Sequence, residues 1–142
     1  MKPVKLSVEY EFDFEILGII SPVKDYKLAL HINRCLDISL KRDEDINLEF
    51  LKEGKIVISC FLSESEYSCL RLLKNKSVEH SNVAKPYLIP ELKEYDYFIH
   101  LSGEGDMWDA DETVSKLREI PIIQYIQKLN TSNLKSRENL IF

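Results

Sequence analysis

From position 6 to position 16, apolar and polar residues alternate without a break. The apolar members are Leu6, Val8, Tyr10, Phe12, Phe14 and Ile16. Successive side chains of a β-strand point to opposite faces, so this alternation predicts a long strand with one buried face. The other face carries Glu9, Glu11, Asp13 and Glu15. Such a face is either solvated, where its charge prevents edge-to-edge pairing, or in contact with a basic partner.

The size and composition of the chain predict one folded domain, residues 1–142, of which 44% are hydrophobic and 30% charged. A chain of this length buries about 68–70% of its unfolded surface. The N-terminal region lacks the apolar core of a signal peptide, and no apolar run reaches the roughly 20 residues of a membrane span. We therefore expect a cytoplasmic protein with no membrane partner. The net charge of −5 disfavours nucleic acid as a partner, unless the basic residues gather on one face.

A helix is predicted after the first strand, which Gly18 interrupts. Ser21 and Pro22 supply an N-cap and a first-turn proline, and apolar residues recur at helical spacing to about Leu36. The opposite side of this helix carries a basic stripe, Lys24, Lys27, His31 and Arg34. The stripe has two interpretations, an ordinary solvated face or a docking site for an acidic partner or a phosphate.

An antiparallel meander is predicted in the middle of the chain, with strands at 46–52, 55–62 and 66–73. Residues 74–88 have no periodic pattern, and we predict a long loop there. Loops of this length in a compact domain are often functional or mobile. Because this loop leads directly into the segment that follows, it is a candidate lid.

That segment, 89–97, begins with Ile89-Pro90-Glu91 and ends with Tyr95-Asp96-Tyr97. It resembles the signature of the IPExxxVDY family of small, functionally uncharacterised bacterial proteins, with Tyr95 in place of valine. The resemblance covers about ten residues. It implies a bacterial origin and assigns no substrate.

Elementary chemistry gives these residues structural roles as well. Pro90 fits the first position of a short helical turn, and the free N–H groups there favour the carboxylate of Glu91. From Tyr95 onward the alternation predicts a strand with Tyr95 and Tyr97 on one face and Asp96 on the other. Asp96 is the acid we expect to be partly desolvated, either accepting backbone N–H groups of its own turn or contacting a ligand or partner.

The C-terminal part is predicted to contain a helix at 109–119, a strand at 122–129 and a tail at 133–142 with an apolar end that docks onto the body or a second subunit. Acidic residues around Trp108 are explained by helix capping better than by metal binding. Trp108 itself is a candidate interaction anchor. Together these elements predict an α+β two-layer sandwich, with a mostly antiparallel sheet of five to six strands and two main helices on one face.

Function is the least determined property. The chain has no nucleophile elbow or phosphate-binding glycine loop, so we assign no catalytic, cofactor-binding or metal residue and favour a protein that is not an enzyme. The leading hypothesis is an interaction module that acts through protein contacts, with an unknown protein partner or a second copy of itself. The alternative is a small-ligand-binding protein or an undetected enzyme, with a pocket between the 74–88 loop and the motif. The candidate contacts for a ligand or for a partner protein are Glu91, Tyr95, Asp96, Tyr97 and Trp108.

Overall fold

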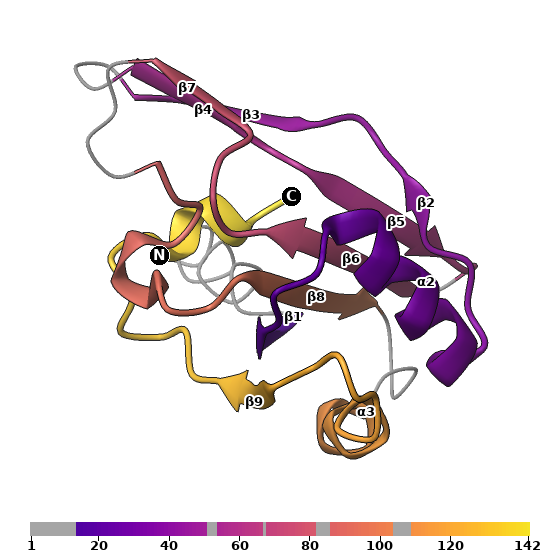
Figure 1. Cartoon of the computed structure of the whole chain (residues 1–142). Helices are drawn as coiled ribbons and strands as arrows, with labels where there is room; N and C mark the ends of the chain where they lie inside the picture. The colour runs from indigo at the N-terminus through magenta and orange to yellow at the C-terminus, as the bar shows by residue number, and fades with distance from the viewer. Residues whose placement is uncertain (1–13, 51–53, 67, 82–85, 104–108) are drawn as a thin grey trace.

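The computed structural model describes residues 14–50, 54–66, 68–81, 86–103 and 109–142 (Figure 1). Within these residues six strands form the main sheet, in the order β2-β5-β6-β8-β1-β9. Every pairing in this sheet is antiparallel. The strands are β1 (Phe14–Ile20), β2 (Lys41–Arg42), β5 (Cys60–Glu64), β6 (Ser68–Lys74), β8 (Tyr97–Gly103) and β9 (Tyr125–Leu129). Most of the strand predicted at 6–16 lies outside the described residues.

A smaller antiparallel sheet of three strands, in the order β3-β4-β7, stands beside the main one. It consists of β3 (Ile46–Phe50), β4 (Gly54–Ile58) and β7 (Glu79–Ser81). The predicted single strand at 55–62 is therefore wrong, because the chain leaves the small sheet after Ile58 and enters the main sheet at Cys60. Between them the buried Ser59 donates its hydroxyl to Asp25 Oδ2 at 2.5 Å. The presence of β7 also corrects the prediction that 74–88 is only a loop.

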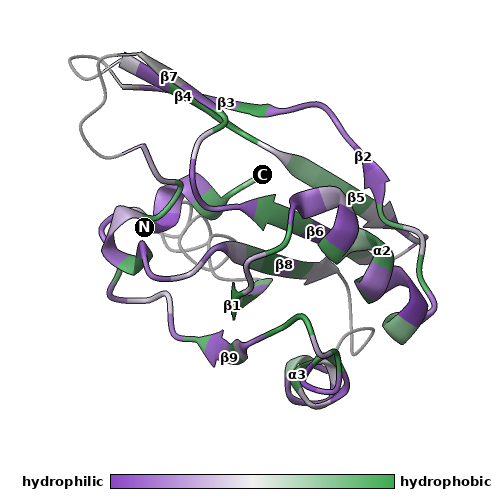
Figure 2. Cartoon of the chain, in the orientation of Figure 1, coloured by the Kyte–Doolittle hydropathy of each residue, from purple (hydrophilic) through white to green (hydrophobic). Residues whose placement is uncertain are grey.

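Two helices, α2 (Asp25–Leu36) and α3 (Ala110–Leu117), cover one face of the main sheet. Their apolar stripes enter a core with the inward side chains of β1, β6 and β8, which Figure 2 shows as the hydrophobic centre of the molecule. We call this the helix-side core. The residues that the two helices bury in it are Leu28, Ala29, Ile32, Ala110, Val114 and Leu117. The α+β prediction, with both helices on one sheet face, is confirmed.

The ends of the helices follow local chemistry, with one exception. Asp109 caps α3 by accepting the backbone N–H of Glu112, as its position predicts. The predicted cap of α2 at Ser21 is wrong, since α2 begins at Asp25 with Lys24 as its N-cap residue and no side-chain cap. Ser21 instead donates its hydroxyl to the carbonyl of Ile122 at 2.6 Å. Ser21 thus bonds Ile122, which is distant in sequence, and does not bond the N-terminal turn of α2.

The opposite face of the main sheet packs against the motif and the C-terminal tail. Two short 3-10 helices, η1 (Pro90–Leu92) and η2 (Arg137–Leu140), lie on this side (Figure 1). Leu140 of η2 and the partly buried Leu92 of η1 pack with Ile16, Leu73 and Phe98 in a second cluster, the tail-side core. Leu140 is fully buried there, so the tail docks onto its own chain. Both faces of the main sheet are therefore covered.

Gly18 does not interrupt β1 but lies inside it, contrary to the prediction. A Cβ atom at this position would lie 2.7 Å from Cδ1 of Tyr95 and 2.8 Å from Cδ1 of Leu129. Both distances are shorter than any stable contact between carbon atoms. Glycine is required because the ring of Tyr95 and the side chain of Leu129 lie directly over the strand.

Candidate functional site

The motif segment is folded around the side chain of Asn75, the residue after β6. Asn75 Nδ2 donates hydrogen bonds to the carbonyls of Leu92 and Tyr95, each at 3.0 Å. Its Oδ1 accepts the backbone N–H of Ile89 at 3.0 Å. A buried amide satisfies all its strong donors in this way. Asn75 thus fixes both ends of the turn that begins with Ile89.

The backbone of Asn75 adds two further hydrogen bonds to the same segment. Its N–H donates to the carbonyl of Asp96 at 2.9 Å, and its carbonyl accepts the N–H of Leu88 at 2.7 Å. Asn75 lies in the stretch 74–88, which was predicted as a loop, and its role in holding the motif was not predicted. The available signal was a short amide residue directly after an apolar strand, a type that often bonds neighbouring backbone.

Pro90 opens η1, as predicted, and Glu91 lies in its first turn. The carboxylate of Glu91 accepts the Ser136 hydroxyl at 2.7 Å and the Ser136 backbone N–H at 2.9 Å. Partial burial alone would raise the pKa of Glu91, but these hydrogen bonds outweigh it and lower the pKa. Glu91 therefore holds the C-terminal tail, and it is not among the residues that line the cleft described below.

Tyr95 and Tyr97 do not share a face, so that prediction is wrong. Tyr95 precedes β8 and packs in the tail-side core, with its hydroxyl accepting Gln127 Nε2 at 2.8 Å. Tyr97 is the first residue of β8 and packs in the helix-side core, where its hydroxyl donates to the carbonyl of Val23 at 2.5 Å. Burial, followed by the nearby carboxylates of Asp25 and Asp96, raises the pKa of Tyr97.

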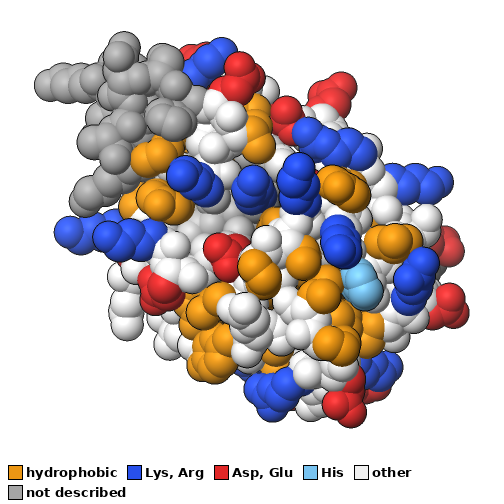
Figure 3. All heavy atoms as spheres, in the orientation of Figure 1, with side chains coloured by type: hydrophobic (Ala, Val, Ile, Leu, Met, Phe, Trp, Pro, Cys, Tyr) orange, Lys and Arg blue, Asp and Glu red, His pale blue; other side chains and the backbone are white. Residues whose placement is uncertain are grey.

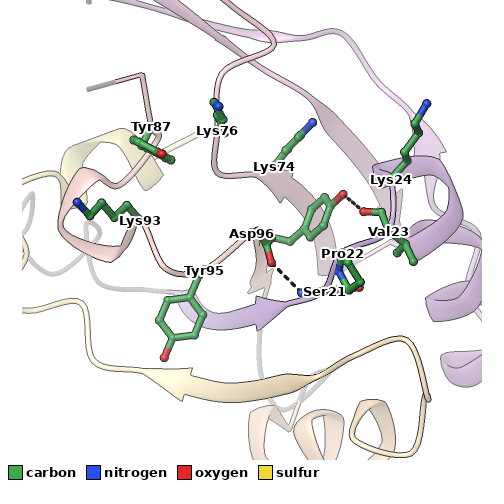
Figure 4. A pocket seen from close by; sticks show the side chains of 11 residues that line it. Ser21, Pro22, Val23, Lys24, Lys74, Lys76, Tyr87, Lys93, Tyr95 and Asp96 are labelled. Atoms are coloured by element: carbon green, nitrogen blue, oxygen red, sulfur yellow. Dashed lines mark hydrogen bonds between the residues drawn. The ribbon is translucent and has the colours of Figure 1, made fainter. Parts of the chain in front are cut away.

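Asp96 is exposed, not desolvated as we expected, and its backbone contact is distant in sequence. Its Oδ2 accepts the N–H of Ser21 at 2.9 Å, which ties the motif to the connection between β1 and α2 (Figure 4). The backbone N–H of Asp96 also donates to the carbonyl of Ile19 at 2.9 Å. Asp96 therefore fixes the position of the segment that leads into α2.

A cleft of about 300 Å³ opens where this segment, the end of β6 and the motif meet. Figure 4 shows the side chains that surround it, with Asp96 near the centre. Lysines from three separate parts of the chain line it, and Tyr87 contributes a half-buried ring. The full lining is Ser21, Pro22, Val23, Lys24, Lys74, Lys76, Tyr87, Lys93, Tyr95, Asp96 and Tyr97.

The charge of this lining is unbalanced. It contains four lysines but only one carboxylate, that of Asp96. Among the described residues the ion pairs join Arg42 to Asp45 and Lys116 to Glu112, and no lysine of the cleft takes part in one. The N-terminus of α2 borders the same cleft, where the Asp25 carboxylate accepts the Tyr26 N–H at 2.7 Å and offsets the partial positive charge of the helix, so the positive charge of the cleft comes from its lysines. The cleft is therefore suited to an anion.

Three of the four hydroxyl groups of the lining are already engaged, and the fourth is that of Tyr87. Those of Ser21 and Tyr97 donate to backbone carbonyls, and that of Tyr95 bonds Gln127. Within the part of the chain that the structure describes, no group of three His, Cys, Asp or Glu side chains could hold a metal ion. The chemistry that the cleft offers is the binding of negative charge by ammonium groups.

The predicted basic stripe runs along α2 next to this cleft. Lys24, Lys27 and Arg34 are exposed, His31 is half-exposed, and Lys24 also lines the cleft. In the structure the stripe therefore lies next to the motif region, whereas the two were separate predictions from the sequence. Trp108, the remaining candidate contact, lies outside the described residues.

No protein-family model matches the chain, and no curated protein matches it. In the described residues, no helix is both long and apolar enough to cross a membrane.

Proposed function

We propose that this protein is a non-enzymatic binding protein whose cleft takes an anionic group, a phosphate or a carboxylate. The observation that carries the proposal is the group of four lysines around a cleft of about 300 Å³, with no ion pair to a described residue. Lysines gathered in this way on a chain of net charge −5 raise the local concentration of anions.

The position of the cleft supports the second of the two hypotheses drawn from the sequence. The pocket lies between residues 74–88 and the motif, and Tyr95, Asp96 and Tyr97 line it. The hypothesis of self-association relied on the apolar tail, but Leu140 of the tail is buried against its own chain. Trp108, its other support, is not described. An anion-binding cleft is thus the better supported proposal.

The expected affinity is modest and depends on salt. A single exposed charge pair contributes about 0–1 kcal/mol, so several lysines acting together give weak to moderate binding. Because the ammonium groups are open to solvent, added salt screens them over a Debye length of about 8–10 Å. Multivalent anions should therefore bind better than monovalent ones at the same ionic strength.

The experiment is a titration with pyrophosphate and with citrate at constant ionic strength, followed by NMR chemical shifts and by thermal unfolding. A ligand at a hundred times its dissociation constant stabilises the folded state by about 2.7 kcal/mol. We expect shifts confined to the lining residues, and their loss in the double variant Lys74→Ala/Lys76→Ala. The matched control is Lys55→Ala/Lys128→Ala, which removes two exposed lysines outside the cleft. Equal binding by both variants, or no binding by the native protein, would refute the proposal.

A further inference from the structure

The basic surface does not end at the rim of the cleft. Lys24 belongs both to the lining of the cleft and to the stripe on α2, so the two are continuous. Figure 3 shows Lys and Arg side chains in a band that extends from the region of η1 and β6 across to α2. From Lys24 to Arg34 the helix rises about 15 Å. A small anion in the cleft would leave this part of the surface unused.

Apolar side chains accompany the stripe. Tyr26 and Leu30 are 63% and 47% exposed, which is unusual for large apolar residues on a helix. They are four residues apart and therefore adjacent on one side of α2, next to the cations of Lys27 and Arg34. An exposed aromatic and an exposed leucine among positive charges form a surface that complements acidic and apolar side chains together.

A single-stranded nucleic acid fits this surface less well than a ligand with acidic and apolar side chains. Proteins that bind single strands stack the bases on exposed aromatic rings. Tyr95 and Tyr97 of the cleft are only 6% and 2% exposed and are packed in the two cores, so among the aromatic residues of this surface the half-buried Tyr87 and the exposed Tyr26 remain for stacking.

We propose that the anionic group in the cleft belongs to an acidic peptide segment of a partner protein, which continues from the cleft along α2. This inference rests on the proposed function of the cleft and identifies its ligand class. Carboxylates of the peptide contact the lysines of the cleft, Lys27 and Arg34, and its apolar residues contact Tyr26 and Leu30. At about 3.3 Å per extended residue, a segment of about eight to ten residues spans the whole surface.

The test measures the fluorescence anisotropy of a labelled peptide of this length in which Glu alternates with Leu and Phe. Two reference ligands are an all-Glu peptide of equal charge and a thymidine oligonucleotide of equal charge. We expect the mixed peptide to bind about tenfold more tightly than either reference, since each apolar contact adds a factor of several.

Three double variants assign the binding to its parts. The charge reversal Lys27→Glu/Arg34→Glu should weaken the peptide about tenfold or more and leave pyrophosphate binding unchanged. Tyr26→Ser/Leu30→Ser should remove the preference for the mixed peptide over the all-Glu peptide. Lys74→Ala/Lys76→Ala should weaken both the peptide and pyrophosphate. All six side chains are exposed or half-exposed, and circular dichroism verifies that each variant is folded.

The outcomes separate this inference from the function on which it rests. If pyrophosphate binds in the cleft but charge reversal on α2 does not affect the peptide, the inference is wrong and the proposed function stands. If the oligonucleotide binds more tightly than the mixed peptide, the inference is also wrong. If neither pyrophosphate nor any peptide responds to the cleft variant, both proposals fail.

Discussion

The side-chain oxygen of Asn75 accepts the backbone N–H of Ile89, across fourteen positions of sequence, while its nitrogen donates to two carbonyls of the same turn. One amide group thereby shapes the segment whose sequence is the most distinctive in the chain. The hydrogen bonds of Asn75 give the motif a structural role, whereas the proposed binding of an anion depends on the lysines around the motif.

We expect Asn75→Ala to destabilise the protein by about 2–4 kcal/mol, because it removes the side-chain partner of the buried Ile89 N–H and Tyr95 carbonyl and one of the two partners of the Leu92 carbonyl. Urea unfolding measures this change. The control is Asn47→Ala, since Asn47 is exposed and donates only to the Asp45 carbonyl at 3.3 Å. A loss below about 0.5 kcal/mol at Asn75, similar to a typical surface change, would contradict the role assigned to it.

Gly18→Ala should destabilise the protein by about 1–3 kcal/mol through overpacking against the ring of Tyr95. The double variant Gly18→Ala/Tyr95→Leu tests the cause, since the smaller side chain removes the collision with the ring and leaves the one with Leu129. We expect the two changes to be non-additive, with the double variant more stable than the sum of the single losses predicts by about 1 kcal/mol. Strict additivity would show that the added methyl group acts elsewhere.

The contact of Glu91 with Ser136 should weaken in acid. The folded-state pKa of Glu91 lies below its ordinary value of 4.5, so the unfolded chain takes up the proton first as the pH falls. The contact therefore stabilises the folded state above this ordinary value, and the stabilisation is lost as the pH falls through the folded-state pKa. Because the carboxylate is exposed, the effect is below about 1 kcal/mol.

Hydrogen exchange of the tail amides in native protein and in Glu91→Gln, at neutral and acidic pH, measures this effect. The difference between the two proteins should be present at neutral pH and absent in acid. Ser136→Ala is the matched control, because it removes the hydroxyl donor but keeps the backbone N–H. A difference that grows in acid would refute the assignment.

His100 should make folding sensitive to pH over a different range. Burial and the neighbouring Arg71 lower its pKa from 6.5 to about 4, and its Nε2 lies 2.9 Å from the Leu140 carbonyl. Its ring is stacked on Phe14 and touches the edge of Phe142. Between the two pKa values only the unfolded chain is protonated, so stability falls as the pH falls from 6.5 toward 4.

The full loss amounts to about 3 kcal/mol, from 1.36 kcal/mol per pKa unit. His100→Phe should flatten this part of the stability profile, although it also loses the bond to Leu140. Denaturant unfolding across the range gives the two slopes, and NMR of the imidazole gives the pKa directly. Protonation of the folded protein near pH 6.5 would contradict the prediction.

Local patterns in the sequence were sufficient for most of the elements. Helical spacing predicted both helices, and Pro90 and Asp109 predicted the starts of η1 and α3. These features depend on residues within a few positions of each other. The α+β class followed from them. The family resemblance and the role of Trp108 stay predictions.

The features that were missed depend on partners distant in sequence. Gly18 resembles a strand breaker until Tyr95, from another part of the chain, is placed above it. Tyr95 itself continues the alternation of β8 in sequence, yet it lies in the turn before the strand. The lysines of the cleft come from the start of α2, the end of β6 and the motif, so no periodicity connects them. Of these lysines, only Lys24 was identified from the sequence, as part of the basic stripe on α2.

The one-residue connection at Ser59, between β4 and β5, affects how the molecule unfolds. Between β4 and β5 the small sheet is joined to the main sheet by this one buried residue, without a linker at that crossing. Its hydroxyl is held by Asp25 of α2, so release of β4 breaks a contact of the helix as well. We expect the small sheet to lack an unfolding transition of its own and to unfold together with the main sheet and the helices.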